Sequence, residues 1–87
     1  MKFLHSEVVI EEGEAIRVSL KGSEARVMVM DERNFFRYRN GSRFEFAGGS
    51  YGATPAVIRP PRGGSWNVVI DPGNYAGNVE PTISVIR

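Results

Sequence analysis

The sequence contains no cysteine, which excludes disulfide bonds, thiolate metal sites and a cysteine nucleophile. It has a single histidine, His5, and a single tryptophan, Trp66. No apolar run approaches the roughly 18 residues that a membrane-spanning helix needs, and the first residues do not form a signal peptide. We therefore expect a soluble, cytoplasmic protein that folds as a single domain over residues 1–87.

Residue sets with catalytic or metal-binding spacing are also missing. His5 has no histidine, cysteine or clustered carboxylate at ligand spacing, so it is interpreted as a surface or packing histidine. The glycines of residues 48–52 lack the Gly-Lys-Ser/Thr of a phosphate-binding loop, and we expect a turn there. Asp71 begins a Pro-Gly turn, where Asp commonly bonds its own backbone. We expect no enzyme activity, no metal and no cofactor.

The net charge of the whole sequence is small, but positive charge is concentrated in one stretch. The net charge is only +1, yet the stretch from Arg33 to Arg62 holds six arginines against Glu45 alone. Guanidinium groups favour planar, bidentate or stacking contacts. The sequence therefore predicts a local basic face rather than a general attraction to nucleic acid.

Apolar residues that alternate with polar ones predict about seven short strands. The chain is organised around residues 64–75, where Trp66, Val68 and Ile70 share one face and a type II turn at Asp71-Pro72-Gly73 ends the strand. A two-residue hairpin loop is expected at Gly22-Ser23. The remaining strands are expected at residues 3–10, 15–21, 25–30, 43–47, 55–59 (at an edge) and 79–86.

Residues 31–39 break the period of two and predict one short helix. Asp31 can cap its first turn, and Phe35 and Tyr38 would face the core together. Asn40-Gly41 suits the end of a helix, and a tight Asn-Gly hairpin turn is the competing interpretation. The whole pattern predicts an all-β fold, a small antiparallel, jelly-roll-like β-sandwich with one short helix; a partly open barrel is the alternative.

Two features indicate an interaction surface. The stretch 25–30 is apolar on both sides, so it is either central and covered or lies at an interface. On the predicted helix, Phe36 turns about 100° away from Phe35 and would be exposed among arginines, a composition typical of binding hot spots. The opposing interpretation places the aromatic rings in the core and the arginines in water. The candidate interaction residues are Met28, Met30, Phe36, Arg37, Arg39 and Arg43.

A family resemblance is carried by two blocks of residues. The first is Met30-Asp31-x-x-Asn34-Phe35-x-x-Tyr38-Arg39-x-Gly41, and the second is Gly64-x-Trp66-x-Val68-Val69-Ile70-Asp71-x-Gly73-x-Tyr75-x-Gly77, with Gly48-Gly49 between them. In this order the blocks resemble the bacterial family catalogued as domain of unknown function 1883. The resemblance implies a compact β-sandwich-like domain with no established catalytic residues.

Some members of that family carry the domain beside a Toll/interleukin-1-receptor-type signalling domain, which implies an adaptor or sensor role. No such domain follows within these 87 residues, which weakens that implication for this chain.

The predicted function is a non-enzymatic interaction or sensor module that binds a protein partner or forms a homodimer. One alternative is a small-ligand or carbohydrate-binding sandwich that uses Tyr51, Tyr75 or Trp66 as a ring platform. The other is binding of single-stranded nucleic acid through the arginine and aromatic stretch. Neither a membrane nor nucleic acid is the expected partner.

Overall fold

The computed structural model describes residues 3–22, 24–51, 55–72 and 79–87, and the side chains of Ser50 and Tyr51 are not described. The described chain contains one helix and strands close to the predicted positions. In chain order the elements are β1 (Leu4–Ile10), β2 (Ala15–Gly22), β3 (Ala25–Met30), α1 (Glu32–Arg39), β4 (Ala47–Tyr51), β5 (Ala56–Ile58), β6 (Gly64–Asp71) and β7 (Val79–Ile86).

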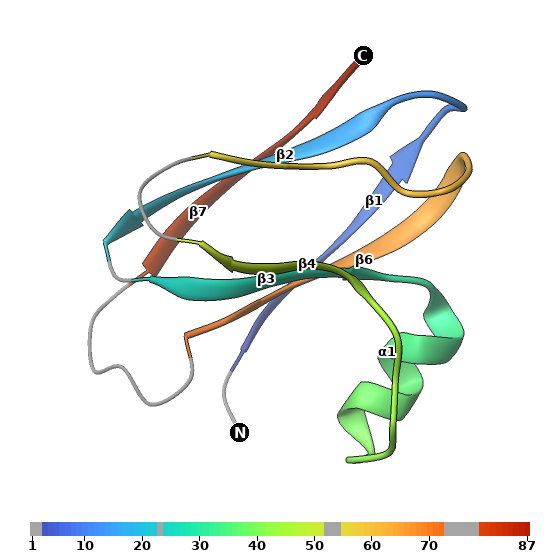
Figure 1. The fold of residues 1–87 in the computed structure, drawn as a ribbon, viewed down its shortest axis with the longest axis vertical. Coiled ribbons are helices and arrows are strands. Elements are labelled where there is room, and N and C mark those ends of the chain that lie inside the picture. Colours follow the sequence, from blue (N-terminus) through green and yellow to red (C-terminus); the bar gives the residue numbers. More distant parts are fainter. Residues whose placement is uncertain (1–2, 23, 52–54, 73–78) are drawn as a thin grey trace.

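The strands form two antiparallel sheets that pack as a β-sandwich (Figure 1). The four-stranded sheet has the order β1-β6-β3-β4, and the three-stranded sheet has the order β5-β2-β7. The chain passes from one sheet to the other at every connection except that from β3 through α1 to β4. The described strands do not close into a barrel, so the predicted sandwich is confirmed.

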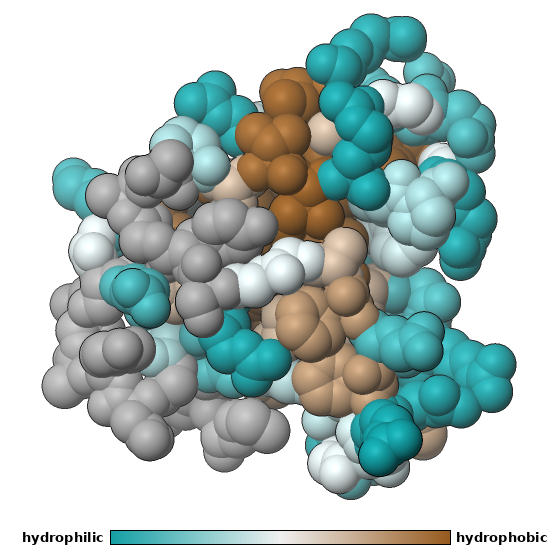
Figure 2. Space-filling view, in the orientation of Figure 1, coloured by the Kyte–Doolittle hydropathy of each residue, from teal (hydrophilic) through white to brown (hydrophobic). Residues whose placement is uncertain are grey.

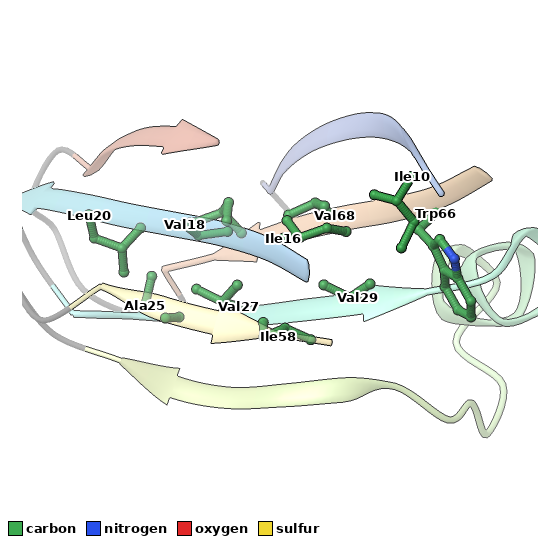
Figure 3. Close-up of a cluster of buried hydrophobic side chains, with 12 residues drawn as sticks. Ile10, Ile16, Val18, Leu20, Ala25, Val27, Val29, Ile58, Trp66 and Val68 are labelled. Atoms are coloured by element: carbon green, nitrogen blue, oxygen red, sulfur yellow. The ribbon is translucent and has the colours of Figure 1, made fainter. Parts of the chain in front are cut away.

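The core between the sheets is built from the inward-facing branched side chains of β2, β3 and β6. Ile16 and Val18 of β2 are fully buried, as are Val27 of β3 and Val68 of β6. Figure 3 shows these side chains in a row between the two layers, with Trp66 at the end next to the helix. Burial of such apolar area is the main favourable contribution to folding. The predicted inward face of residues 64–71 is therefore confirmed.

The hairpin predicted at Gly22-Ser23 is wrong. β2 pairs with β5 and β7, whereas β3 pairs with β4 and β6, so the two consecutive strands lie in different sheets. Both hydrogen-bonding edges of β2 are occupied by strands distant in sequence. This long-range pairing outweighs the local turn signal of a Gly-Ser dipeptide.

The strand predicted at residues 43–47 is shifted toward the C-terminus. β4 begins at Ala47 and includes Gly48 and Gly49, which the sequence placed in a turn. Gly48 has φ +126°, and a Cβ on it would overlap the carbonyl oxygen of Val27 on the neighbouring strand. Only glycine accepts both the positive φ and this close approach. Here glycine marks tight strand packing instead of a loop.

Gly73 of the turn predicted at Asp71-Pro72-Gly73 lies outside the described residues, and so does Tyr75. The edge strand expected around Val57 is confirmed, since β5 is an outer strand of its sheet and follows Pro55. The C-terminal strand is confirmed as β7. On the face of the molecule seen in Figure 2, hydrophobic side chains gather in a strip beside hydrophilic ones.

Candidate interaction surface on the helix face

Helix α1 begins at a side-chain cap. The Oδ1 atom of Asp31 accepts hydrogen bonds from the backbone N–H and the side-chain amide of Asn34, both at 2.9 Å. The bond from the backbone N–H of Asn34 is the main reason that the pKa of the Asp31 carboxyl lies below its ordinary value; the Asn34 side chain, Arg62 and Arg33 add to the effect. An ionised cap satisfies free amides and suits the positive end of the helix dipole.

The helix ends at the predicted Asn-Gly pair. The N–H of Gly41 donates to the carbonyl of Tyr38 at 3.2 Å, and the N–H of Ser42 donates to the carbonyl of Arg37 at 2.9 Å. Gly41 has φ +74°, so these two bonds form a Schellman cap with glycine in the left-handed conformation. The competing hairpin interpretation of Asn40-Gly41 is wrong, because the pair closes a helix that is held at both ends.

One side of the helix packs on the outer face of the four-stranded sheet. Phe35 and Tyr38 are buried there against Met28 and Met30 of β3 and Val69 of β6. Met28 is 0% and Met30 is 1% exposed. Of the two interpretations of the doubly apolar strand, the central and covered one is correct. The prediction that Met28 and Met30 contact a partner is therefore wrong, because the chain's own helix covers both side chains.

The remaining candidates lie in the second half of the helix and in the segment just after it. Phe36 is 65% exposed, as its position one residue after Phe35 predicted. Arg39 and Arg43 are exposed and Arg37 is half-buried. The guanidinium of Arg39 lies 5.6 Å from the ring centre of Phe35, which orients that side chain along the helix. We define the helix face as these four residues: Phe36, Arg37, Arg39 and Arg43.

The helix face carries uncompensated positive charge. Among the described residues, ion pairs within 4.0 Å join Arg62 to Asp31 and Arg87 to Glu11, and none involves an arginine of the helix face. Arg37 and Arg39 lie in the last helical turn, where positive charge is favoured by the helix dipole. The exposed ring of Phe36 thus lies on a helix whose last turn carries two guanidinium groups without an acidic partner in the described chain.

A small cavity lies at the other end of the helix. It encloses about 240 Å³, and Asp31, Asn34, Glu45, Phe46 and Trp66 contribute to its wall together with apolar residues of β3 and Pro60-Pro61. The N–H of Glu45 donates to Asn34 Oδ1 at 2.8 Å, which fixes the returning chain beside the helix. Ligand pockets usually enclose about 300–1,000 Å³, so this cavity suits only a very small molecule.

The DUF1883 family, described as a domain of unknown function, matches the chain over residues 1–87. The chain belongs to this family. No curated protein and no solved structure matches it. The resemblance carried by the two sequence blocks is therefore confirmed. In this DUF1883 domain the first block runs from the end of β3 through the capped helix, and the described part of the second block forms β6.

The ring platform predicted at Trp66 is not available for stacking. Trp66 is 5% exposed, its indole N–H donates to the carbonyl of Arg62 at 3.0 Å, and the Arg62 guanidinium lies 4.8 Å from its ring centre. The side chain of Tyr51 and all of Tyr75 lie outside the described part of the chain. Trp66 contributes one wall of the cavity but offers no open ring face.

His5 of this DUF1883 domain takes part in packing, as the sequence indicated. Its ring stacks on Phe35 with 4.1 Å between ring centres, and its Nε2 lies 2.7 Å from Asn67 Oδ1. The Asn67 amide in turn donates to Glu32 Oε2 at 3.2 Å. Asn67 is 2% exposed, so this chain of bonds satisfies a buried amide.

The His5–Asn67–Glu32 arrangement and the cavity were both missed from the sequence. The first joins residues of β1, β6 and α1, and the cavity wall joins residues of β3, α1, β6 and the segments before β4 and β6. Within the described residues no group of three or more histidine, cysteine or acidic side chains is placed to hold a metal ion. Nor does any helix in that part of the chain combine the length and apolar character needed to cross a bilayer.

Proposed function

We propose that this chain is a non-enzymatic interaction module whose helix face binds an acidic protein partner. The observation that carries the proposal is the 65% exposed ring of Phe36 on a helix that is capped at both ends, with Arg37 and Arg39 in its last turn and no acidic partner for either in the described chain. A rigid helix loses little conformational entropy when it binds. Aromatic and arginine side chains dominate the energetics of most protein interfaces.

The charge of the surface indicates the chemistry of the partner. Arginine binds carboxylates through two parallel hydrogen bonds, which adds directional specificity to charge attraction. A partner with an apolar pocket rimmed by Asp or Glu would cover Phe36 and pair with Arg39 and Arg43. Because exposed charges are screened by salt, association with such a partner should slow as ionic strength rises.

Affinity capture with matched variants tests the proposal. Wild type, Phe36→Ala and Val57→Ala are immobilised and exposed to extract from cells that encode the chain, and retained proteins are quantified. Val57 is 53% exposed on β5, so its substitution controls for loss of an exposed apolar side chain elsewhere. We expect Phe36→Ala to weaken capture of an acidic partner by roughly 30-fold, the effect of a hot spot of about 2 kcal/mol.

Arg39→Glu should weaken the same interaction, whereas Val57→Ala should leave it unchanged. Equal capture by all variants would remove the helix face from consideration. Binding of single-stranded oligonucleotides that falls steeply with salt and is lost in Arg39→Glu would instead support the nucleic-acid alternative.

The cavity supports a second candidate, the binding of a small polar ligand such as a sugar. Its wall combines Phe46 and Trp66 with Asp31, Asn34 and Glu45, and such a mixture of apolar and polar residues is typical of ligand sites. Titration of Trp66 fluorescence with monosaccharides tests this candidate, with Glu45→Ala as the variant. Saturable changes that Glu45→Ala weakens would support it, and a flat response up to high sugar concentration would exclude sugars.

A further inference from the structure

In the described part of the chain, the outer strand β1 has one hydrogen-bonding edge without a neighbouring strand. Among the described strands it pairs with β6 alone, as the first strand in the order β1-β6-β3-β4 (blue in Figure 1). Proteins usually protect such edges with short strands, proline, lysine or bulges. β1 is seven residues long, contains neither proline nor lysine, and pairs with β6 in continuous register without a bulge. Its exposed residues are Leu4, His5, Ser6, Glu7 and Val9.

The other outer strands differ from β1. β5 has three residues and lies between Pro55 and Pro60, and β7 has Pro81 near its middle. β4 lies beside β5 of the opposite sheet and contains Gly48 and Gly49, which weaken strand pairing. Of the four outer strands, β1 is the one that combines length, regular geometry and exposure.

We infer that β1 pairs with β1 of a second copy of this chain, antiparallel and centred on Ser6. A two-fold axis through the centre of an antiparallel pair places identical residues opposite each other there. With Ser6 at the centre, His5 of each copy lies opposite Glu7 of the other. Leu4 lies opposite Val8 on the inner face, and Phe3 lies opposite Val9 on the face that carries the helix.

Each of these cross-strand pairs is chemically matched. The imidazole of His5 meets a carboxylate at two symmetric positions, and opposite or hydrogen-bonding groups across strands stabilise pairing. The Leu4–Val8 pairs cover side chains that are 45% exposed at Leu4 and half-buried at Val8. Val9, the most exposed large apolar side chain of the described chain at 72%, gains Phe3 as its neighbour.

The adjacent register is disfavoured by charge. Centring the pair on Glu7 would place the two Glu7 carboxylates directly opposite each other, and like charges at such positions destabilise a sheet. A shift by one residue toward His5 instead would place two His5 side chains opposite each other and Leu4 opposite Ser6. Ser6 is thus the centre at which both the polar and the apolar pairs are complementary.

Nε2 of His5 is engaged by Asn67, so Nδ1 is the nitrogen left to donate to Glu7 of the second copy, which requires the doubly protonated ring. The amide of Asn67 donates to Glu32, so its Oδ1 accepts, and His5 therefore donates from Nε2. Stacking on Phe35 holds the ring in place on the face that Glu7 of the second copy would share. No residue of the helix face belongs to β1, so the dimer and the proposed partner are tested with different variants.

A single cysteine introduced into this cysteine-free chain reports the register directly. Opposite residues in antiparallel strands have Cα atoms about 4.5–5.5 Å apart, within the range of disulfides. Under mild oxidation we expect Ser6→Cys to form a cross-linked dimer at least tenfold faster than Ser84→Cys, an exposed position on the outer strand β7. Glu7→Cys should also be slow, because its two copies would lie beyond the roughly 7 Å limit for a disulfide.

Sedimentation over a concentration series provides the second measurement. Wild type should approach twice the monomer mass as concentration rises, and Ser84→Lys should behave in the same way. Ser6→Lys places two ammonium groups opposite each other and should weaken dimerisation at least tenfold, while its circular dichroism spectrum stays that of wild type. A wild type that stays monomeric, a dimer that Ser6→Lys leaves unchanged, or equal cross-linking of Ser6→Cys and Ser84→Cys would overturn the inference.

Discussion

The outer faces of the two sheets differ in what covers them. On the three-stranded sheet, Arg17, Lys21 and Val57 point outward and are exposed. On the four-stranded sheet, Met28, Met30 and Val69 point outward and are buried, because helix α1 lies on them. The outer faces of the two sheets thus differ because helix α1 covers only that of the four-stranded sheet.

This difference shows why a small domain needs more than one apolar layer. A sheet pair of this size has a thin core, and the helix adds a second cluster in which the rings of Phe3 and Tyr38 meet edge-on at 5.2 Å. The helix that completes this layer also carries Phe36 on its far side. The stabilising side of α1 and its candidate binding side are therefore inseparable in sequence but distinct in space.

The largest expected effect on stability comes from removing a side chain from the outer face that the helix covers. Met28→Ala should lower the free energy of unfolding by about 2–5 kcal/mol, because it leaves a cavity beneath the helix. Val57→Ala on the bare face should change it by less than about 0.5 kcal/mol. Urea denaturation measures both. Equal effects would mean that the helix layer does not act as a core.

A smaller effect is expected from detaching the start of the helix. Asp31→Ala should cost about 0.5–2 kcal/mol, the usual value for losing a helix cap, in chemical denaturation at neutral pH. The pKa of Asp31 is lowered from 3.8 in the folded protein, so its ionised form contributes stability above that value. This contribution should be lost as pH falls through the lowered folded pKa.

Asp31→Asn provides the matched control for the cap, because it keeps a side-chain acceptor without charge. Its stability relative to wild type should therefore improve as the solution becomes acidic. A difference between wild type and Asp31→Asn that stays constant down to about pH 2 would contradict the assignment of the lowered pKa.

The smallest effect concerns the polar border of the covered face. The Tyr38 hydroxyl donates to Asp71 Oδ2 at 3.2 Å, and burial together with this carboxylate raises the pKa of Tyr38 to about 12. A raised folded pKa contributes stability below the ordinary value of 10.0 that is lost as pH rises through about 12. Tyr38→Phe should cost about 0.5–1.5 kcal/mol at neutral pH.

Spectrophotometric titration of the tyrosinate band measures this pKa. Wild type should show a late component that Tyr38→Phe lacks. If the wild-type absorbance change were complete near the ordinary value, the Tyr38–Asp71 contact would not persist in solution.

Several elements could be predicted from local sequence because local physics determines them. Asp31 and Gly41 mark the ends of α1 through side-chain capping and a left-handed glycine, which involve only neighbouring residues. The alternation of Ile16, Val18 and Leu20 predicted a half-buried strand for the same reason. The exposure of Phe36 followed directly from helix geometry once Phe35 and Tyr38 faced the core.

Other features depend on pairings between distant segments. The Gly22-Ser23 signal could not show that β2 binds β5 and β7, because turn preference is local and strand choice is not. Met28 and Met30 suited a covered strand or an interface equally well. The cavity joins residues of β3, the segment before β4, Pro60-Pro61 and Trp66, and no spacing along the chain indicates that assembly.

By itself, the sequence determined the kinds of element, the ends of the helix and the identity of the side chains that face inward, since periodicity and capping act over a few residues. Only the tertiary structure decided which strands pair, that α1 covers Met28 and Met30, and that β1 pairs with β6 alone among the described strands. Those outcomes depend on burying apolar area and satisfying backbone hydrogen bonds across the whole chain at once, which no local stretch encodes.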